Sequence, residues 1–72
     1  MRRVLLERNY IKEYRKLRGI KYQKDLAVLA DVPKSTLGEI ERHKMRGDPG
    51  TLDKIAKALG ITRKELYVNP LL

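Results

Sequence analysis

Residues 32–44, VPKSTLGEIERHK, carry hydrogen-bonding side chains at the spacing of a helix that buries only one narrow edge. Leu37 and Ile40 form its apolar line, and Pro33 suits its first turn. The rest of its surface is polar, because it carries Lys34, Ser35, Thr36, Glu39 and Arg42. Ammonium, hydroxyl and carboxylate groups on one helix can donate hydrogen bonds to, and accept them from, the edges of nucleic-acid bases. We therefore expect a binding surface here.

Catalytic chemistry has few candidates in this chain. It contains one Ser, one His and no Cys, which leaves no nucleophile and base to combine, and we expect no enzyme. His43 stands alone without a carboxylate cluster, so we expect neither a metal site nor a cofactor. The lack of Cys suits a reducing cytoplasm, and the chain has neither an apolar run of membrane-spanning length nor a signal-peptide pattern. We expect a cytoplasmic protein.

Positive charge is concentrated at the start of the chain. The net charge is +8, and residues 1–24 hold nine Lys or Arg residues against only Glu7 and Glu13. Such a surface attracts polyanions, of which nucleic acid is the commonest and an anionic membrane the second. A solvated face that keeps a small basic domain in solution is the alternative interpretation. Charge alone leaves these interpretations open.

Apolar spacing predicts helices and no strand of any length. The first helix is expected from Asn9 to a stop before Gly19, with an apolar face of Tyr10, Ile11, Tyr14 and Leu17. The second helix, residues 22–30, has on one side Leu26, Leu29 and Ala30. Asp31 follows where the chain must turn sharply, and the polar helix comes next. The short connection between these two helices is the geometry of a helix-turn-helix, in which the small Ala27 allows the close crossing.

Residues 43–72 are expected to form a loop and two more helices. Residues 43–50 are rich in Gly and positive charge and read as the loop. A fourth helix is expected with a cap, a first-position proline and a terminal glycine at Asp48, Pro49 and Gly60. Its inward side chains are Leu52, Ile55, Ala56 and Leu59. A fifth helix begins with the capping-box spacing of Thr62 and Glu65 and buries Leu66 before Asn69-Pro70 ends it.

Several spaced features make the chain similar to the phage-repressor and Cro-like helix-turn-helix family, also described as xenobiotic-response-element-type, over about residues 10–67. The matching features are Gln23, Leu26-Ala27, Val32, KSTLGEIE with Glu41, and TLDKIAKALGI. The chain departs from the family pattern at three places. Asp31 stands where the family usually has Gly. The link from Gly19 to Gln23 is one residue longer than usual, and Pro49 lies later than the family's usual Pro before the fourth helix. The resemblance implies a compact, all-α, five-helix, lambda-repressor-like domain. It also implies a sequence-specific regulator of transcription that binds double-stranded DNA and acts as a repressor.

The resemblance implies roles for individual residues, with the polar helix in the major groove and its N-terminal side chains at base edges. Base-reading residues would be Lys34, Ser35, Gly38 and Glu39. Phosphate contacts would come from Tyr22, Gln23, Thr36, Arg42, Lys44 and Arg46. In the family, residues matching Arg15 and Glu41 pair internally and fix this helix against the first. Alternatively, Ser35 and Thr36 satisfy first-turn amides, Glu39 pairs with Lys34 or His43, and the Arg15 and Glu41 charges are solvated.

Domain organisation and partners follow from the same residues. Seventy-two residues are enough for one compact core, so we expect a single domain over residues 1–72 with a basic extension at 1–8 and an apolar tail at 68–72. We expect a homodimer, because one helix-turn-helix reads few base pairs. The tail could pack against its mate or against Val4–Leu6, through Leu66, Val68, Leu71 and Leu72. The alternative function is an antitoxin or adaptor of the same fold that binds a protein partner.

Overall fold

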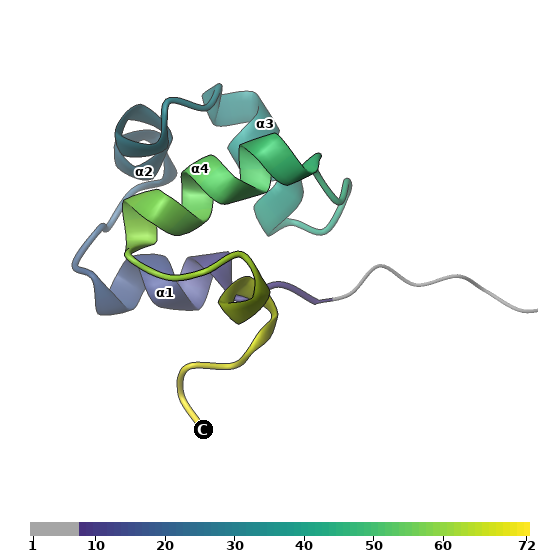
Figure 1. The fold of residues 1–72 in the computed structure, drawn as a ribbon. Helices are drawn as coiled ribbons and strands as arrows, with labels where there is room; N and C mark the ends of the chain where they lie inside the picture. The colour runs from purple at the N-terminus through teal and green to yellow at the C-terminus, as the bar shows by residue number, and fades with distance from the viewer. Residues whose placement is uncertain (1–7) are drawn as a thin grey trace, which may run out of the picture.

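Four α-helices and one short 3-10 helix form the part of the chain that the computed structural model describes, residues 8–72 (Figure 1). They are α1 (Ile11–Leu17), α2 (Gln23–Ala30), α3 (Lys34–Glu41), α4 (Pro49–Leu59) and η1 (Lys64–Tyr67). None of the described residues lies in a strand, so the all-α class is confirmed. Helix α2 packs against both α3 and α4, and α4 lies between α1 and α2 in Figure 1.

Local signals set the ends of α2 and α4 where the sequence predicted them. Asp31 closes α2 in the left-handed conformation, with φ 58°, and this sharp turn starts the connection to α3. Asp48 caps α4 by accepting hydrogen bonds from the hydroxyl and the amide of Thr51. These bonds hold the pKa of the Asp48 carboxyl below its usual value, and the hydroxyl of Thr51 has the larger effect. Short turns with locally fixed ends therefore connect the helices.

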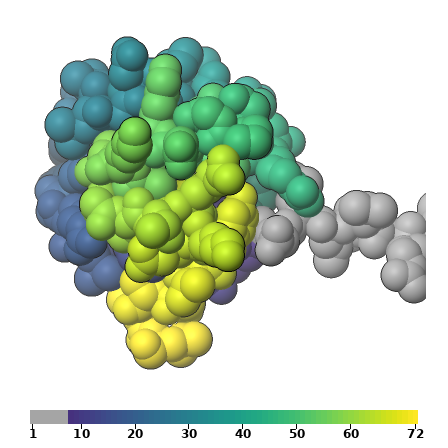
Figure 2. Space-filling model, viewed as in Figure 1, coloured from purple at the N-terminus to yellow at the C-terminus, as the bar shows by residue number. Residues whose placement is uncertain are grey.

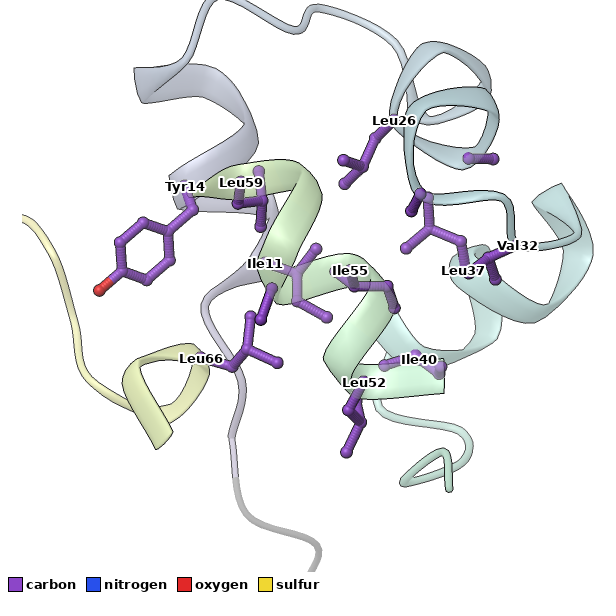
Figure 3. Close-up of a cluster of buried hydrophobic side chains, with 13 residues drawn as sticks. Ile11, Tyr14, Leu26, Val32, Leu37, Ile40, Leu52, Ile55, Leu59 and Leu66 are labelled. Atoms are coloured by element: carbon purple, nitrogen blue, oxygen red, sulfur yellow. The ribbon is translucent and has the colours of Figure 1, made fainter. Parts of the chain in front are cut away.

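The core is built around α4, whose inward side chains meet those of every other helix (Figure 3). Leu52, Ile55 and Leu59 are buried as predicted. The largest fully buried side chains are Ile11, Leu26, Leu37, Ile40, Ile55, Leu59 and Leu66. Burying a large aliphatic side chain stabilises a fold by about 1.5–3 kcal/mol, so this cluster supplies most of the folding free energy of a chain without disulfides.

The prediction was wrong for two residues that were expected on inward faces. Leu17 and Leu29 both lie at the surface, half or more exposed. On α2 the buried face consists of Leu26 and Ala30, as predicted, together with Ala27, and the two small alanine side chains allow α3 and α4 to come close. Leu29 therefore falls outside the contact, although its spacing from Leu26 is helical. The consequence is an apolar outer face on α2.

The predicted fifth α-helix is instead the four-residue 3-10 helix η1. Its capping box forms as predicted, because the amide of Thr62 donates to Glu65 Oε1 at 2.9 Å and the amide of Glu65 donates to Thr62 Oγ1 at 3.3 Å. The residue before a proline avoids the helical conformation, and Asn69 precedes Pro70. The chain is already extended at Val68, so no second turn forms.

Leu66 is buried, as predicted for the last helix, so it cannot share in the contact predicted for the apolar tail. The amide of Tyr10 donates to the carbonyl oxygen of Leu66 at 2.7 Å. The side chains that remain exposed at the C-terminus are Val68, Leu71 and Leu72. The predicted packing against Val4–Leu6, and residues 1–7 of the basic extension, lie outside the described residues.

Candidate nucleic-acid interface

Helix α3 is held by one edge and presents the other to solvent. Leu37 and Ile40 are fully buried, whereas three of the predicted base-reading side chains are exposed: Lys34, Ser35 and Glu39. None of these three, nor the half-buried Thr36, forms a side-chain hydrogen bond or ion pair with another residue in 8–72. The alternative interpretations are therefore not seen in residues 8–72. Within this range, Ser35 and Thr36 do not cap backbone amides, and Glu39 forms no ion pair.

Gly38 differs in its burial from the other residues predicted to contact bases. It is buried, and a Cβ atom at this residue would lie 3.1 Å from Arg42 Nη1 and 3.3 Å from Gln23 Oε1. The Arg42 side chain thus lies over Gly38, one turn further along the helix. Close approach of DNA to the Gly38 backbone stays a prediction, and it would require Arg42 to move aside.

A buried ion pair fixes α3 against α1. Arg15 Nε donates to Glu41 Oε2 at 3.2 Å and Arg15 Nη2 to Glu41 Oε1 at 3.4 Å, and both side chains are almost completely buried. Arg15 Nη1 also donates to the carbonyl oxygens of Ile20 and Lys21, in the link to α2. One guanidinium therefore ties α1, the α1–α2 link and α3 together. This is the contact that the resemblance implied for these two residues.

Gln23 joins the same cluster from the start of α2. Its Nε2 atom donates to Glu41 Oε1 at 3.1 Å, so the side chain is turned toward the ion pair. The sequence predicted a phosphate contact for this residue, but it could not predict that Glu41 accepts the hydrogen bond. In this geometry the Gln23 side chain helps to position α3, and its contact with phosphate remains a prediction.

A cationic hollow of about 560 Å³ opens above this cluster, between α1, the α1–α2 link, the start of α2 and α3. Its basic lining residues, apart from the buried Arg15, are Lys12, Lys21, Lys24, Lys34 and Arg42. The ammonium groups of Lys21 and Lys24 lie 5.6 and 5.7 Å from the ring centre of the exposed Tyr22. The sequence prediction named Tyr22, Lys34 and Arg42 but missed the three other lysines. The charge excess of residues 1–24 was the signal that pointed to them.

Further basic residues follow α3 in the loop that leads to α4. Arg42, Lys44 and Arg46 are all exposed, whereas the neighbouring Glu41 is buried. His43 has a positive φ of 63°, and its Nε2 atom accepts a hydrogen bond from the amide of Asn9 at 3.1 Å. The amide side chain of Asn9 donates to the carbonyl oxygen of Ile40 at 2.8 Å. These bonds fix the C-terminal end of α3, and no sequence signal predicted them.

Two other kinds of site are absent from residues 8–72. No group of three or more His, Cys, Asp or Glu side chains there could hold a metal ion. No helix within that range is long and apolar enough to cross a membrane.

Comparison with known proteins identifies a family. A family model described as helix-turn-helix matches residues 11–66, a segment that contains all four α-helices, the cationic hollow and the basic loop. No curated protein matches the chain significantly, and no solved structure does. The matched segment therefore carries the whole candidate interface.

Proposed function

Since the chain belongs to the Cro/C1-type, phage repressor-like helix-turn-helix family, we propose that it is a sequence-specific regulator that binds double-stranded DNA with α3 in the major groove. The observation that carries the proposal is the exposed polar face of α3, whose side chains are free of hydrogen bonds and ion pairs with residues 8–72. The buried pair of Arg15 and Glu41 supports it, because it holds this face in one orientation.

The side chains divide into two roles in this proposal. Lys34 would donate to guanine O6 and N7, Ser35 would bond several bases, and Glu39 would accept from cytosine N4. Phosphates would be contacted on one strand by Tyr22 and the amides near Gln23, and on the other strand by Thr36, Arg42, Lys44 and Arg46. The base contacts would supply specificity, and the phosphate contacts would supply affinity and register.

We further propose that two copies occupy one operator and repress transcription by covering it. A single helix-turn-helix reads few base pairs, and half-sites are spaced by about one helical turn, roughly 34 Å. Val68, Leu71 and Leu72 are the exposed tail residues available for a symmetric contact between the copies. Sedimentation at micromolar concentration with and without DNA tests this, and an 8.4 kDa species alone in both cases would contradict it.

A second candidate function is an antitoxin or adaptor that acts through a protein partner, and the exposed apolar side chains at the C-terminus favour it. The two functions differ in their response to salt. Binding to random duplex DNA should weaken steeply as salt rises, because each phosphate contact releases counterions. A flat salt dependence would favour the protein-binding function.

The decisive experiment separates residues that contact the DNA bases from residues that contact the DNA phosphates. Selection from random DNA first supplies a preferred site. Lys34→Ala or Ser35→Ala should then cost about 1–3 kcal/mol on that site and much less on random DNA, so the specificity ratio falls.

Lys44→Ala or Arg46→Ala should instead weaken both DNAs alike. Each phosphate that is no longer neutralised should reduce the slope of log affinity against log salt by about 0.9. Lys57→Ala removes a charge that is also exposed, from α4, and serves as the control. Identical behaviour of the α3 and loop variants would contradict the placement of α3 in the groove.

A further inference from the structure

The connection between α2 and α3 carries an apolar hollow that the proposed contacts with DNA leave unused. It measures about 530 Å³, and its apolar lining residues include Val28, Val32 and Pro33. Val28 is 80% exposed and Pro33 is also exposed, whereas Val32 is buried and anchors the connection in the core. Two exposed apolar side chains therefore share one hollow at the start of α3.

The rim of this apolar hollow is continuous with the candidate DNA interface. Lys24 and Lys34 line both the apolar hollow and the cationic hollow beside it. Asp31 also belongs to the lining, but Lys54 Nζ lies 3.9 Å from its Oδ2 atom and offsets part of its charge. The surroundings of the apolar hollow are thus positive, so a polyanion that crosses the cationic hollow can extend over it.

Pro33 offers a ligand an apolar ring and no hydrogen-bond donor. It has no amide hydrogen, and its carbonyl oxygen accepts the amide of Leu37 at 3.0 Å in the first turn of α3. Its backbone is in the ordinary proline conformation, with φ −57° and ψ 137°. A contact with this ring costs no side-chain entropy, because proline has no side-chain freedom to lose. Pro33 also stands directly before Lys34, at the end of α3 whose residues contact base edges in the proposed function.

We propose that the ring of Pro33 packs against the C5-methyl group of a thymine, so that the protein prefers thymine next to the base contacted by Lys34. This inference rests on the proposed function, in which α3 lies in the major groove. Thymine differs from the other three bases there by its methyl group, which forms no hydrogen bond and is recognised by apolar contact. Pro33 thus adds a specificity-determining residue of a different chemistry from the polar side chains of α3.

This contact is compatible with the two-copy arrangement proposed above. Figure 1 shows the connection between α2 and α3 at one end of the domain and the C-terminal segment at the other. Figure 2 shows the same separation on the surface, with the teal residues of α2 and α3 at the top and the yellow C-terminal residues at the bottom. The tails can therefore join two copies while Pro33 of each copy contacts its own half-site.

Replacing thymine with deoxyuridine removes the methyl group and keeps every hydrogen-bonding atom of the base. On the site selected from random DNA, each thymine is replaced in turn and the affinity of the unaltered protein is measured. One replacement in each half-site should weaken binding about fourfold, which corresponds to about 0.8 kcal/mol for one buried methyl-sized group at 1.4 kcal/mol per factor of ten. The sensitive thymine should lie next to the position at which Lys34→Ala loses its preference.

A second substitution in the DNA isolates the methyl group from the rest of the base. Cytosine at the sensitive position, paired with guanine, should bind more weakly than thymine. Relative to cytosine, 5-methylcytosine should recover about fourfold in affinity, because the two bases differ only in the methyl group. These measurements need no protein variant, so they do not depend on whether a substituted chain folds.

Pro33→Ala tests whether the proline ring is the group that meets the methyl. In this variant the effect of deoxyuridine should fall from about fourfold to below about twofold, because the two removed groups no longer touch each other. Pro49→Ala is the matched control, since Pro49 is also exposed at the start of a helix, and it should keep the full effect. Far-UV circular dichroism checks that both variants are folded.

The outcomes separate this inference from the proposed function. A selected site at which no deoxyuridine replacement changes the affinity would overturn the thymine contact and leave the proposed function intact. A methyl effect that persists in folded Pro33→Ala would also overturn it, because another residue would then contact the thymine. Failure of the selection to return any preferred site would contradict the proposed function and this inference together.

Discussion

Replacing Glu41 with Ala would leave the guanidinium of Arg15 buried without its carboxylate. In the intact domain the two side chains are 6% and 3% exposed and share two hydrogen bonds. Removing one partner of such a pair costs about 3–5 kcal/mol, because the remaining charge is shielded from water and has no opposite charge beside it. An exposed pair would cost below about 1 kcal/mol. The variant therefore measures how far this contact holds α3 in place.

The structure favours the lower end of this range of about 3–5 kcal/mol for the loss of stability in Glu41→Ala. Arg15 Nη1 keeps the carbonyl oxygens of Ile20 and Lys21 as acceptors, at 3.1 and 2.6 Å, so the charge is not left without any hydrogen bond. The Nε2 atom of Gln23 loses its acceptor, which adds a smaller cost. We expect a loss of about 3 kcal/mol. A small domain is stable by roughly 0.05–0.15 kcal/mol per residue, so this loss is a large part of the total.

Urea unfolding followed by far-UV circular dichroism measures the change. The double variant Arg15→Met with Glu41→Leu is the control, because it removes both charges and keeps the volume. It should recover part of the stability, as paired replacements of buried ions commonly do. A loss below about 1 kcal/mol for Glu41→Ala would refute the argument and make the pair an ordinary surface contact. No difference between the single and double variants would refute the role of charge.

Two further predictions concern backbone turns and capping. Gly47→Ala should destabilise the domain by about 2 kcal/mol or more, because φ is 85° and a Cβ atom would lie 2.8 Å from Ile40 Cδ1. Gly19→Ala, with φ 75° and nothing within 4 Å, should cost only about 1 kcal/mol in the same urea titration, and equal losses would contradict the clash. The Thr51 hydrogen bonds that lower the pKa of Asp48 should add stability above about pH 4, and this contribution should disappear as pH falls through the lower native pKa. Acid titrations of Asp48→Asn should lack this part of the pH dependence, and an unchanged profile would contradict the assignment.

Helix positions were predictable where the signal was local. Asp48, Thr62 and Glu65 act on backbone groups within three residues of themselves, so their capping bonds could be read directly from the sequence. Leu17 and Leu29 were misassigned because helical spacing identifies an apolar stripe without showing which edge of it meets another helix. The close packing around Ala27 and Ala30 decided that edge.

The candidate site was predictable in outline and less so in detail. The exposed face of α3 followed from the narrow apolar line of Leu37 and Ile40. The inward turn of Gln23 depends on Glu41, 18 residues away, and therefore on the folded positions of three elements. Asn9 and His43 meet across 34 residues, and neither residue type signals such a contact.

The side chains of Lys34, Ser35 and Glu39 form no hydrogen bonds or ion pairs with the other residues in 8–72. This has a consequence for sequence variation. Substitutions at these positions change the chemistry of the outer face of α3 while Leu37, Ile40 and Glu41 continue to hold the helix. Under the proposed function, a change of target and the stability of the fold would therefore depend on different residues. This separation makes these three positions the natural ones to randomise in a library.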